Sequence, residues 1–507
     1  MQGDIQHIGV VGSGAMGRGI AQAAALSGAQ VLLVDADQGI AQAAHAAIAQ
    51  ALETEVAKGR LAREKADGAL DRLRVAAGLA SLKNAQLVIE AITEDLDAKR
   101  RLFAELEGVV AEDCILASNT SSLSITTLAA ACKRPGRVAG MHFFNPVSRM
   151  RLVEVIQAHR TEPHIIDTLE AVGQKMDKDV VHVQDTPGFL VNQVGRGYTL
   201  EAVNIVGEGV ASFEQVDRIM REAAGFRMGP FELLDLVGLD VNHPATEMIY
   251  AQFYHEPRYR PSPLMDMRVA AGALGRKTQE GYYRYPVAPV SSESDGKALA
   301  PATTGPACPV WVSAAQPDAG QAVRELLSSL GAEVEAGERP GPDALCVVTP
   351  IGRDASYAAA AENLDPTRTV AIDTLFGLKT HRTVMGTCIT DERWRQAAVA
   401  LFAADGVPVT LVRDSPGFIA QRIVAMIINI GGALAQARTA TAAGIDRAVT
   451  LGLAYPHGPL SFANALGANN VLQLLNGLHA SFGDPRYRPA LWLQRRAALN
   501  LDFREGD

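Results

Sequence analysis

IQHIGVVGSGAMGRGIAQAAALSGAQVLLVD, residues 5–35, is the stretch that decides the fold of this 507-residue chain. Gly12, Gly14 and Gly17 stand in G-x-G-x-x-G spacing directly after the apolar run Ile8–Val11. An Ala-rich amphipathic stretch follows, and a second apolar run ends at Asp35. The order of strand, glycine turn, helix and strand predicts a βαβ unit that opens a doubly wound sheet.

Each part of this unit has a physical role in holding a dinucleotide. Gly12 permits the tight turn, Gly14 leaves room for a pyrophosphate, and Gly17 lets helix and strand pack closely. The pyrophosphate then lies on the free N–H groups at the helix N-terminus. Asp35 offers its carboxylate to both ribose hydroxyls and would repel the 2′-phosphate of NADP, and no Arg follows it. The sequence therefore predicts NAD, the alternative being a glycine turn without a nucleotide.

Composition excludes several classes of protein. The chain is 48% apolar and 20% charged, which is typical of a globular protein. The net charge of −9 argues against a nucleic-acid partner. No apolar run approaches the roughly 20 residues of a membrane span, and the longest candidate, Ile423–Leu434, indicates a buried helix. The five cysteines have no C-x-x-C pairing, so we expect no metal site and no disulfides. With MQGDIQH entering the first strand at once, this favours a cytoplasmic protein.

The pattern along the chain predicts an α/β protein with several domains. Residues 1–185 alternate apolar strands with helices, as in a mostly parallel sheet, and residues 186–285 read as all helical. Residues 286–309 have the Pro, Ser, Ala and Gly content of a linker. Residues 310–413 read as a second, degenerate α/β block without G-x-G-x-x-G, and 414–507 as a second helical domain. The strands expected are Ile8–Val11, Val31–Val34, Leu87–Ala91, Cys114–Ala117, Val138–His142, Leu152–Ile156, Val310–Val312, Leu345–Val348, Thr369–Ile372 and Val407–Val412.

An internal repeat supports the duplication of the helical domain. DTPGFLVNQV at Asp185–Val194 reappears as DSPGFIAQRI at Asp414–Ile423, 229 positions later. EPRYRP at Glu256–Pro261 returns as DPRYRP at Asp484–Pro489. We expect the second copy to pack against the first within the chain, because one copy alone would expose a large apolar face.

The densest chemical signal after the glycines is the segment MHFFNP, with Glu154 twelve residues after His142. A carboxylate beside an imidazole fixes its tautomer while the other nitrogen takes a proton. A histidine in such a setting is otherwise a satisfied core residue. The polar run Ser118–Ser122 ends a neighbouring strand, where it serves either as a helix cap or as a group facing cofactor and substrate.

The basic segment Lys58–Arg74 leaves two interpretations open. It carries six Lys or Arg residues against three acids. It is either a solvated helix face or a binding surface for an anionic ligand.

These motifs occur in an order that resembles the NAD-dependent (S)-3-hydroxyacyl-CoA dehydrogenases. They are VGSGAMG, EDLDAK, SNTSSLSI, HFFNP, LVEVI, DTPGFLVN, GPFELLDLVGLD and GRKT, and together they span residues 5–285. The duplicated second half resembles the long bacterial 3-hydroxybutyryl- and 3-hydroxyadipyl-CoA dehydrogenases, including those of phenylacetate catabolism. The resemblance implies an oxidoreductase of β-oxidation type that converts (S)-3-hydroxyacyl-CoA to 3-oxoacyl-CoA.

The resemblance also implies roles for single residues. His142 is the base that takes the C3 hydroxyl proton, Glu154 orients it, and Ser121 and Asn192 place the substrate. Lys58 matches a lysine that contacts coenzyme A, although Ala51 stands where the family has a serine. The residues implied to bind NAD are Gly12, Ser13, Gly14, Ala15, Met16, Gly17, Asp35, Glu94, Lys99, Ser121, Asn145 and Lys277.

The second half lacks this set, so we expect one active site per chain. Gln421 stands where Asn192 is found, and the position most like His142 reads Thr387-Cys388, after Arg382–Gly386. Whether the 310–413 block binds any ligand is left open, and so is the choice between a monomer and a homodimer built on this internal pseudo-dimer.

Two other functions compete with the leading one. One is a related β-hydroxyacid dehydrogenase that uses a lysine as proton donor, and the other is a structural or sensor protein that binds NAD without turnover. The acyl chain cannot be read from the sequence. Arg149 and Arg151 are either ligands of a distal carboxylate on an adipyl chain or surface charges beside a strand.

Overall fold

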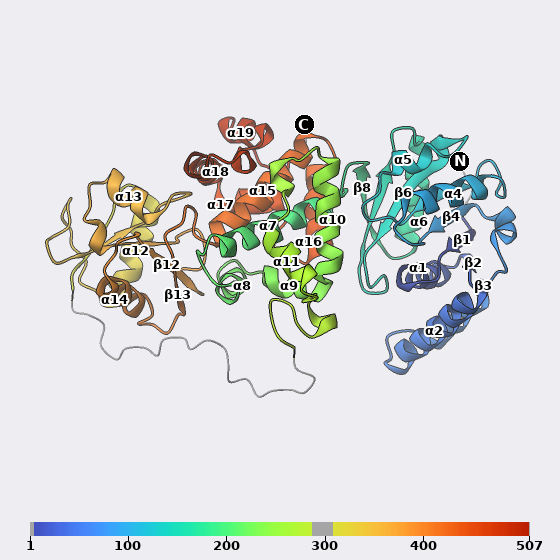
Figure 1. Cartoon of the computed structure of the whole chain (residues 1–507), viewed down its shortest axis with the longest axis horizontal. Helices are drawn as coiled ribbons and strands as arrows, with labels where there is room; N and C mark the ends of the chain where they lie inside the picture. The colour runs from blue at the N-terminus through green and yellow to red at the C-terminus, as the bar shows by residue number, and fades with distance from the viewer. Residues whose placement is uncertain (1–4, 286–307, 506–507) are drawn as a thin grey trace. The chain divides into compact units, whose positions relative to one another are not determined.

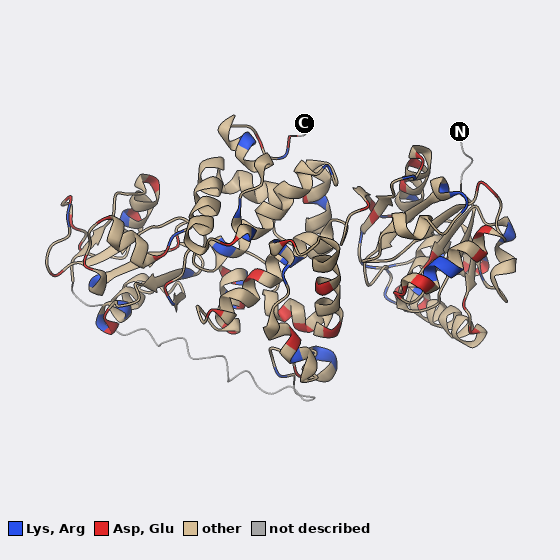
Figure 2. Ribbon diagram, turned by 45° about the horizontal axis from the view of Figure 1, so that its top comes forward, with Lys and Arg blue, Asp and Glu red and all other residues tan. Residues whose placement is uncertain are grey.

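The computed structural model describes residues 5–285 and 308–505, which form two compact bodies (Figure 1). Within the described residues, the first body contains the chain up to Asn192 together with Ala437–Leu453. The second contains Gln193–Gln436 and Ala454–Glu505. Most of the expected linker, residues 286–307, lies outside the described residues. Lys and Arg positions are interspersed with Asp and Glu positions along the ribbons of both bodies (Figure 2).

The first body is built on an eight-stranded sheet in the order β3-β2-β1-β4-β5-β6-β7-β8. The pairing is parallel except between β6 and β7. The chain order reverses beside β1, which is where ligands bind in sheets of this kind. The strands are β1 (His7–Val11), β2 (Gln30–Val34), β3 (Leu73–Val75), β4 (Leu87–Glu90), β5 (Ile115–Ser118), β6 (Val138–Phe143), β7 (Leu152–Gln157) and β8 (Asp179–Gln184).

Six of these strands were expected, and two were missed for different reasons. β3 has three residues and follows a helix directly, so it has no apolar run of its own. β8 reads DVVHVQ, in which apolar and polar residues mix in an edge strand that is only partly buried. The doubly wound, mostly parallel sheet is as predicted.

The helices that connect the strands of the first sheet also cover its faces. The central strands are apolar because both of their faces are buried, as in Leu87, Val88 and Ile89 of β4. The connecting elements are α1 (Ala15–Leu26), α2 (Gln38–Ala57), α3 (Arg63–Arg72), η1 (Leu79–Asn84), α4 (Leu96–Glu107), α5 (Ile125–Ala129), η2 (Pro135–Arg137) and α6 (Pro163–Lys175).

The helical part of the second body contains most of both copies of the repeat. From the first copy come α7 (Val191–Gly207), α8 (Phe213–Glu222), α9 (Pro230–Val237), α10 (Leu239–Gln252), η3 (Pro257–Tyr259), α11 (Pro263–Ala270) and η4 (Arg276–Thr278). From the second come α15 (Ala420–Gln436), α17 (Pro459–Leu466), α18 (Ala468–Phe482), η6 (Pro485–Tyr487) and α19 (Leu491–Ala498). No helix within the described residues is long and apolar enough to cross a membrane. The run Ile423–Leu434 lies in α15, a buried helix, as expected.

The two copies pack against each other through α7 and α15, as the repeat predicted. Gly197 of α7 leaves room for Met426, Ile427 and Ile430 of α15, since a Cβ there would lie 3.1 Å from Ile430 Cδ1. Arg422 of α15 is fully buried and pairs with Glu201 and, through two nitrogens at 2.6 and 2.7 Å, with Glu208. Burial opposes its charge, but Glu201 and Glu208 hold the pKa of Arg422 above its usual value.

The second α/β region is a five-stranded sheet in the order β13-β12-β11-β10-β9. Its strands are β9 (Val310–Val312), β10 (Leu345–Val348), β11 (Thr369–Ile372), β12 (Arg382–Gly386) and β13 (Val409–Val412). Its helices are α12 (Pro317–Ser329), α13 (Ala355–Ala361), η5 (Pro366–Arg368) and α14 (Glu392–Phe402). β12 was not expected as a strand, because its arginine and threonine break the apolar pattern while being fully buried.

This sheet repeats part of the first one. Strands β9–β13 have the order of β4–β8, and β11 and β12 form the antiparallel pair just as β6 and β7 do. Strands like β1–β3 have no counterpart among the described residues of this region. The glycine turn belongs to that missing part.

Each α/β region forms a backbone hydrogen bond with a segment from the other copy of the repeat. Gln184 N, at the end of β8, donates to Thr439 O at 2.8 Å, and Arg413 N, after β13, donates to Val210 O at 3.0 Å. These two pairs are related by the repeat offset of 229 residues. The helix α16 (Ala442–Leu453) of the second copy therefore belongs to the first body, where it packs on β7 and β8.

Candidate functional site

The glycine turn forms an open cradle at the N-terminus of α1. A Cβ on Gly12, whose φ is +101°, would lie 2.4 Å from Ala91 O, and one on Gly17 would lie 1.8 Å from Gly12 O. A Cβ on Gly14 would meet nothing within 4 Å. No side chain caps α1, so its first N–H groups face this open space. The hydroxyl of Ser13 is buried there without a hydrogen-bond partner.

The acid that ends β2 lies at this cradle. Asp35 accepts hydrogen bonds from Ser13 N at 2.7 Å and from Asp37 N at 3.2 Å. No cation pairs with Asp35 among the described residues. A carboxylate without a cation partner, beside an uncapped helix terminus, offers the groups that the ribose and pyrophosphate of NAD require.

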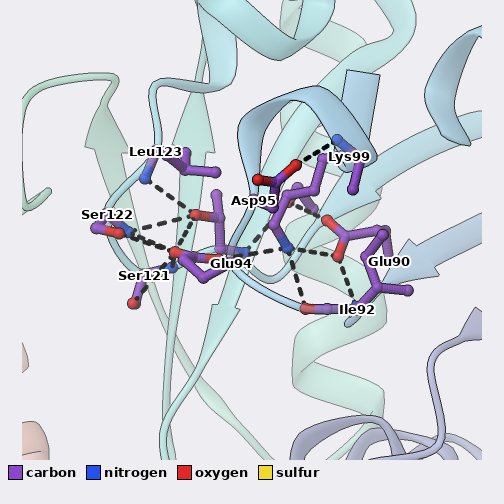
Figure 3. Close-up of polar contacts among 11 residues, drawn as sticks. Glu90, Ile92, Glu94, Asp95, Lys99, Ser121, Ser122 and Leu123 are labelled. Carbon is purple, nitrogen blue, oxygen red and sulfur yellow. Dashed lines mark hydrogen bonds and ion pairs between the residues drawn. The ribbon is translucent and has the colours of Figure 1, made fainter. Parts of the chain in front are cut away.

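A buried ion-pair network lies at the end of β4 (Figure 3). The ammonium of Lys99, on α4, lies 2.5 Å from Glu90 Oε1 and 3.3 Å from Glu94 Oε2. Lys99 and Glu90 are at most 1% exposed. Ser118 Oγ donates to the second oxygen of Glu90 at 2.6 Å. Sequence reasoning missed Glu90, although an acid ending an otherwise apolar central strand is a usable signal.

Glu94 joins this network to the polar loop after β5. Its Oε1 accepts from Thr120 Oγ1 at 2.6 Å, Ser122 Oγ at 2.9 Å and Ser121 N at 3.0 Å. Burial opposes its ionisation, but the Lys99 ammonium and these donors hold the pKa of Glu94 below its usual value. The position of Ser121 is therefore fixed by a charged, hydrogen-bonded carboxylate.

His142 and Glu154 are direct neighbours across the antiparallel pair of β6 and β7. His142 Nδ1 lies 2.7 Å from Glu154 Oε2. Glu154 is fully buried, and its other oxygen accepts from Leu190 N at 3.3 Å and Val191 N at 3.0 Å. The structure gives His142 Nε2 no partner among the described residues, so one ring nitrogen is anchored and the other is free.

The DTPGF motif builds the rest of this site. Asp185 accepts from Thr126 N at 2.7 Å and Ser124 Oγ at 2.9 Å, which fixes the loop after β5. Asn192 Nδ2 donates to Ser121 O at 3.1 Å. The four residues expected to act on substrate thus come together in one body. The role of Asp185 was not expected from the sequence, although its place in the repeated motif pointed to it.

Phe189 and Phe144 line the site beside the imidazole. Their rings lie 5.8 and 4.5 Å from that of His142, measured between centroids. Both Phe189 and the glycine before it have positive φ, so the chain turns sharply here into α7.

The remaining predicted residues are spread more widely. Asn145 is exposed just after β6, in the cis peptide bond to Pro146. Lys58 is exposed at the C-terminus of α2 and forms no ion pair with the described residues. Lys277 belongs to the second body, where it pairs with Asp240.

The basic segment around Lys58 is only partly neutralised. Arg63 pairs with Glu53 through two hydrogen bonds, and Arg72 Nε donates to Ala25 O at 3.1 Å. Arg149 is exposed without an ion pair among the described residues, whereas Arg151 lies 3.3 Å from Asp179.

The second α/β region has a different pair where the first has His142 and Glu154. Alignment of the two sheets by strand register matches Asp373, directly after β11, to His142, and Thr383 to Glu154. The expectation that Thr387-Cys388 matches His142 was therefore wrong, because β12 is the counterpart of β7 and not of β6. Gln421 donates to Asp373 Oδ1 at 2.9 Å and is the counterpart of Asn192.

Comparison with known proteins assigns the chain to a family. The model of the 3-hydroxyacyl-CoA dehydrogenase NAD-binding domain matches residues 7–186. The model of the C-terminal domain of the same enzymes matches twice, at residues 188–285 and 417–502. The chain belongs to the 3-hydroxyacyl-CoA dehydrogenase family. This dehydrogenase is an oxidoreductase that uses NAD.

Relatives of two lengths are similar to this dehydrogenase. The 3-hydroxyadipyl-CoA dehydrogenase of Escherichia coli is 36% identical over 500 residues, which cover 99% of both chains. The crystal structure of 3-hydroxybutyryl-CoA dehydrogenase from Escherichia coli covers 98% of this chain and 99% of its own, with a TM-score of 0.86 and 34% identity. The shorter (S)-3-hydroxybutyryl-CoA dehydrogenase of Ralstonia eutropha is 41% identical, and its whole length covers 56% of this chain, with a TM-score of 0.55.

Proposed function

We propose that this dehydrogenase oxidises the C3 hydroxyl of a short-chain or dicarboxylic (S)-3-hydroxyacyl-CoA, with His142 as the base. The observation that carries the proposal is the imidazole with Nδ1 anchored on Glu154 at 2.7 Å and Nε2 free. It lies in the same body as the glycine cradle. When bound, NAD supplies the nicotinamide ring that accepts the hydride from C3.

The protein's own residues handle the proton and the geometry. His142 takes the hydroxyl proton at Nε2, and Glu154 stabilises the resulting imidazolium while both of its oxygens remain hydrogen-bonded. Ser121 and Asn192 place the C3 oxygen beside that nitrogen. Gly12–Gly17, including Ser13, Ala15 and Met16, hold the pyrophosphate, and Asp35 the adenosine ribose. Glu94, Lys99 and Asn145, which belong to the same body, are assigned to NAD as well, whereas Lys277 belongs to the other body and stays a prediction from the sequence.

The coenzyme A moiety is assigned to the basic segment that begins at Lys58. The 3′-phospho-ADP end of coenzyme A needs cations, and Lys58 is an exposed ammonium without an acid partner among the described residues. Ala51, one and a half to two turns earlier, supplies no hydroxyl. We expect coenzyme A to be held here mainly by charge.

Reduction of acetoacetyl-CoA, followed as loss of NADH absorbance, tests the assignment. The wild type should consume NADH, and H142Q should not, while NADH still binds to both proteins. NADH binding without turnover in the wild type would favour a structural or sensor protein. Turnover that survives in H142Q would favour a proton donor other than the histidine, such as the lysine of the β-hydroxyacid dehydrogenases.

The free guanidinium of Arg149 is the candidate for recognising a dicarboxylic acyl chain. It has no ion pair among the described residues, whereas Arg151 pairs with Asp179, which also pairs with Arg447. R149A should lower kcat/KM for 3-hydroxyadipyl-CoA relative to 3-hydroxybutyryl-CoA by roughly tenfold, the effect of one lost charge-assisted hydrogen bond. R151A is the matched control. An unchanged substrate ratio in R149A would remove Arg149 from the proposal.

We further propose that the enzyme acts in the cytoplasm on a soluble acyl-CoA, without nucleic acid or membrane as partner. The internal pseudo-dimer already pairs two copies of the helical domain, so both a monomer and a homodimer are compatible with it. Sedimentation at concentrations from micromolar upward distinguishes the two states.

A further inference from the structure

The second body contains a cavity of about 790 Å³ at the edge of the five-stranded sheet. Its walls come from the loop between α7 and α8, the end of β12, the end of β13 and the helix α14. Its volume lies in the range of small-molecule sites, which is about 300–1,000 Å³. None of its lining residues belongs to the catalytic site described above.

Two guanidinium groups line this cavity without ion pairs. Arg395, on α14, donates from one terminal nitrogen to Thr387 O at 3.2 Å, but its Nε is buried without a hydrogen-bond partner in the described structure. Arg413, after β13, is exposed and lies beside Gly209. Neither arginine is paired with an acid of the described residues.

The acid that lines the cavity does not neutralise these groups. Asp414 uses its two oxygens to cap α13, accepting from Ala355 N at 2.8 Å, from Ser356 N at 3.3 Å and from Ser356 Oγ. The N-terminus of α8, at Ser212 and Gln215, also lines the cavity. Its first turn contains Glu214 and is closed by the capping box of Ser212 and Gln215, so the positive charge at the cavity comes from the two arginines.

The first half of the molecule provides an internal comparison. At the repeat offset of 229 residues, Arg395 corresponds to Ile166 and Arg413 to Gln184. Both cations are therefore specific to the second copy, at an edge where the first copy has neutral side chains. A fold requirement common to both copies does not explain them.

We propose that this cavity binds a small molecule through a phosphate group held by Arg395 and Arg413. A guanidinium is suited to phosphate because its planar donors match two phosphate oxygens. The site lies outside the NAD cradle and the His142 site, so the proposal is independent of the function proposed above.

Inorganic pyrophosphate is the probe, titrated calorimetrically into the full-length enzyme saturated with NADH. We expect one site per chain that R395M/R413M weakens at least about tenfold, since two charge-assisted contacts are lost. R227M/R495M removes the same charge from two exposed positions of the same body and should bind as the wild type does. K58A should also retain the site, because Lys58 belongs to the other body.

The folding of the variants is checked by acetoacetyl-CoA reduction, which R395M/R413M should leave unchanged. Absence of pyrophosphate binding in the wild type would overturn the proposal. So would equal weakening in both double variants, or loss of binding in K58A alone. Citrate that binds more tightly than pyrophosphate would overturn the assignment to phosphate.

Discussion

The five strands of the second α/β region have the same order as β4–β8 of the first, but the two regions differ at the position of His142. In the first, His142 faces Glu154 and has one free ring nitrogen, beside a glycine cradle. In the second, Asp373 faces Thr383, and β1–β3 have no counterpart in the described part of that region. Sheet topology therefore survived the duplication, while the cradle and the base did not. The comparison shows that the sheet can keep its strand order without the glycine cradle and the pair of His142 and Glu154.

The largest difference should appear between a variant that lacks the proposed base of the first region and a variant that lacks its counterpart in the second region. H142Q should lower kcat by roughly 10²–10⁴-fold, the contribution of general base catalysis. D373N should leave kcat within about twofold, since Asp373 has no part in proton transfer. Acetoacetyl-CoA reduction measures both. A large loss in D373N would mean that the second region takes part in turnover.

The next effect concerns the helical copies, in which Arg422 corresponds to Gln193 at the offset of 229 residues. R422M should lower the free energy of unfolding by up to about 3–5 kcal/mol, because Glu201, 2% exposed, would keep only Arg486, at 3.7 Å, as a cationic partner. Q193M should cost less, about 1–3 kcal/mol, because the buried Tyr259 hydroxyl would lose a neutral acceptor rather than a charged partner. Denaturant unfolding compares the two variants, and equal losses would contradict the asymmetry between the copies.

The third effect is a pH dependence that belongs to the second region. Burial raises the pKa of Asp373 to about 6, so the folded protein binds its proton more tightly than the unfolded chain does. Its stabilising contribution is present in acid and is lost as the pH rises through about 6. The difference in unfolding free energy between wild type and D373N should therefore fall by about 2 kcal/mol from pH 4 to pH 7. A flat difference would contradict the buried, protonated state.

The smallest effect should come from the cradle that only the first region has. D35A should lower the preference for NAD over NADP by roughly tenfold, since a hydrogen-bonded anion is removed. The ratio of kcat/KM for the two cofactors measures it. An unchanged ratio would place the discrimination elsewhere. G14A is a useful companion, because its Cβ clashes with nothing in the protein and would affect only the bound pyrophosphate.

The sequence predicted the first fold well because its signals are local. Local structure can be predicted from the glycine spacing, the apolar strands and the motifs at Asp185 and Asp414. The pairing of His142 with Glu154 followed from two strands that are adjacent in the sequence.

What the sequence did not predict depends on long-range contacts. Glu90 is stabilised by Lys99, and β12 is buried despite Arg382, whose guanidinium pairs with Asp405 at 2.7 Å. The counterpart of His142 was predicted wrongly from the sequence, because the counterpart is defined by strand register. The sequence offset between the two regions is not the same for β11 as for β12. The reciprocal exchange of α16 had no signal in the sequence.

That exchange has a consequence for how the protein is made. β7 and β8 are complete once residue 184 leaves the ribosome, and α6 already packs on them, but the second helix that packs on them, α16, begins only at residue 442. The nascent first body must therefore wait for most of the remaining chain before α16 can complete the packing on β7 and β8. Such a delay lengthens the window for wrong association and favours help from a holding chaperone during synthesis.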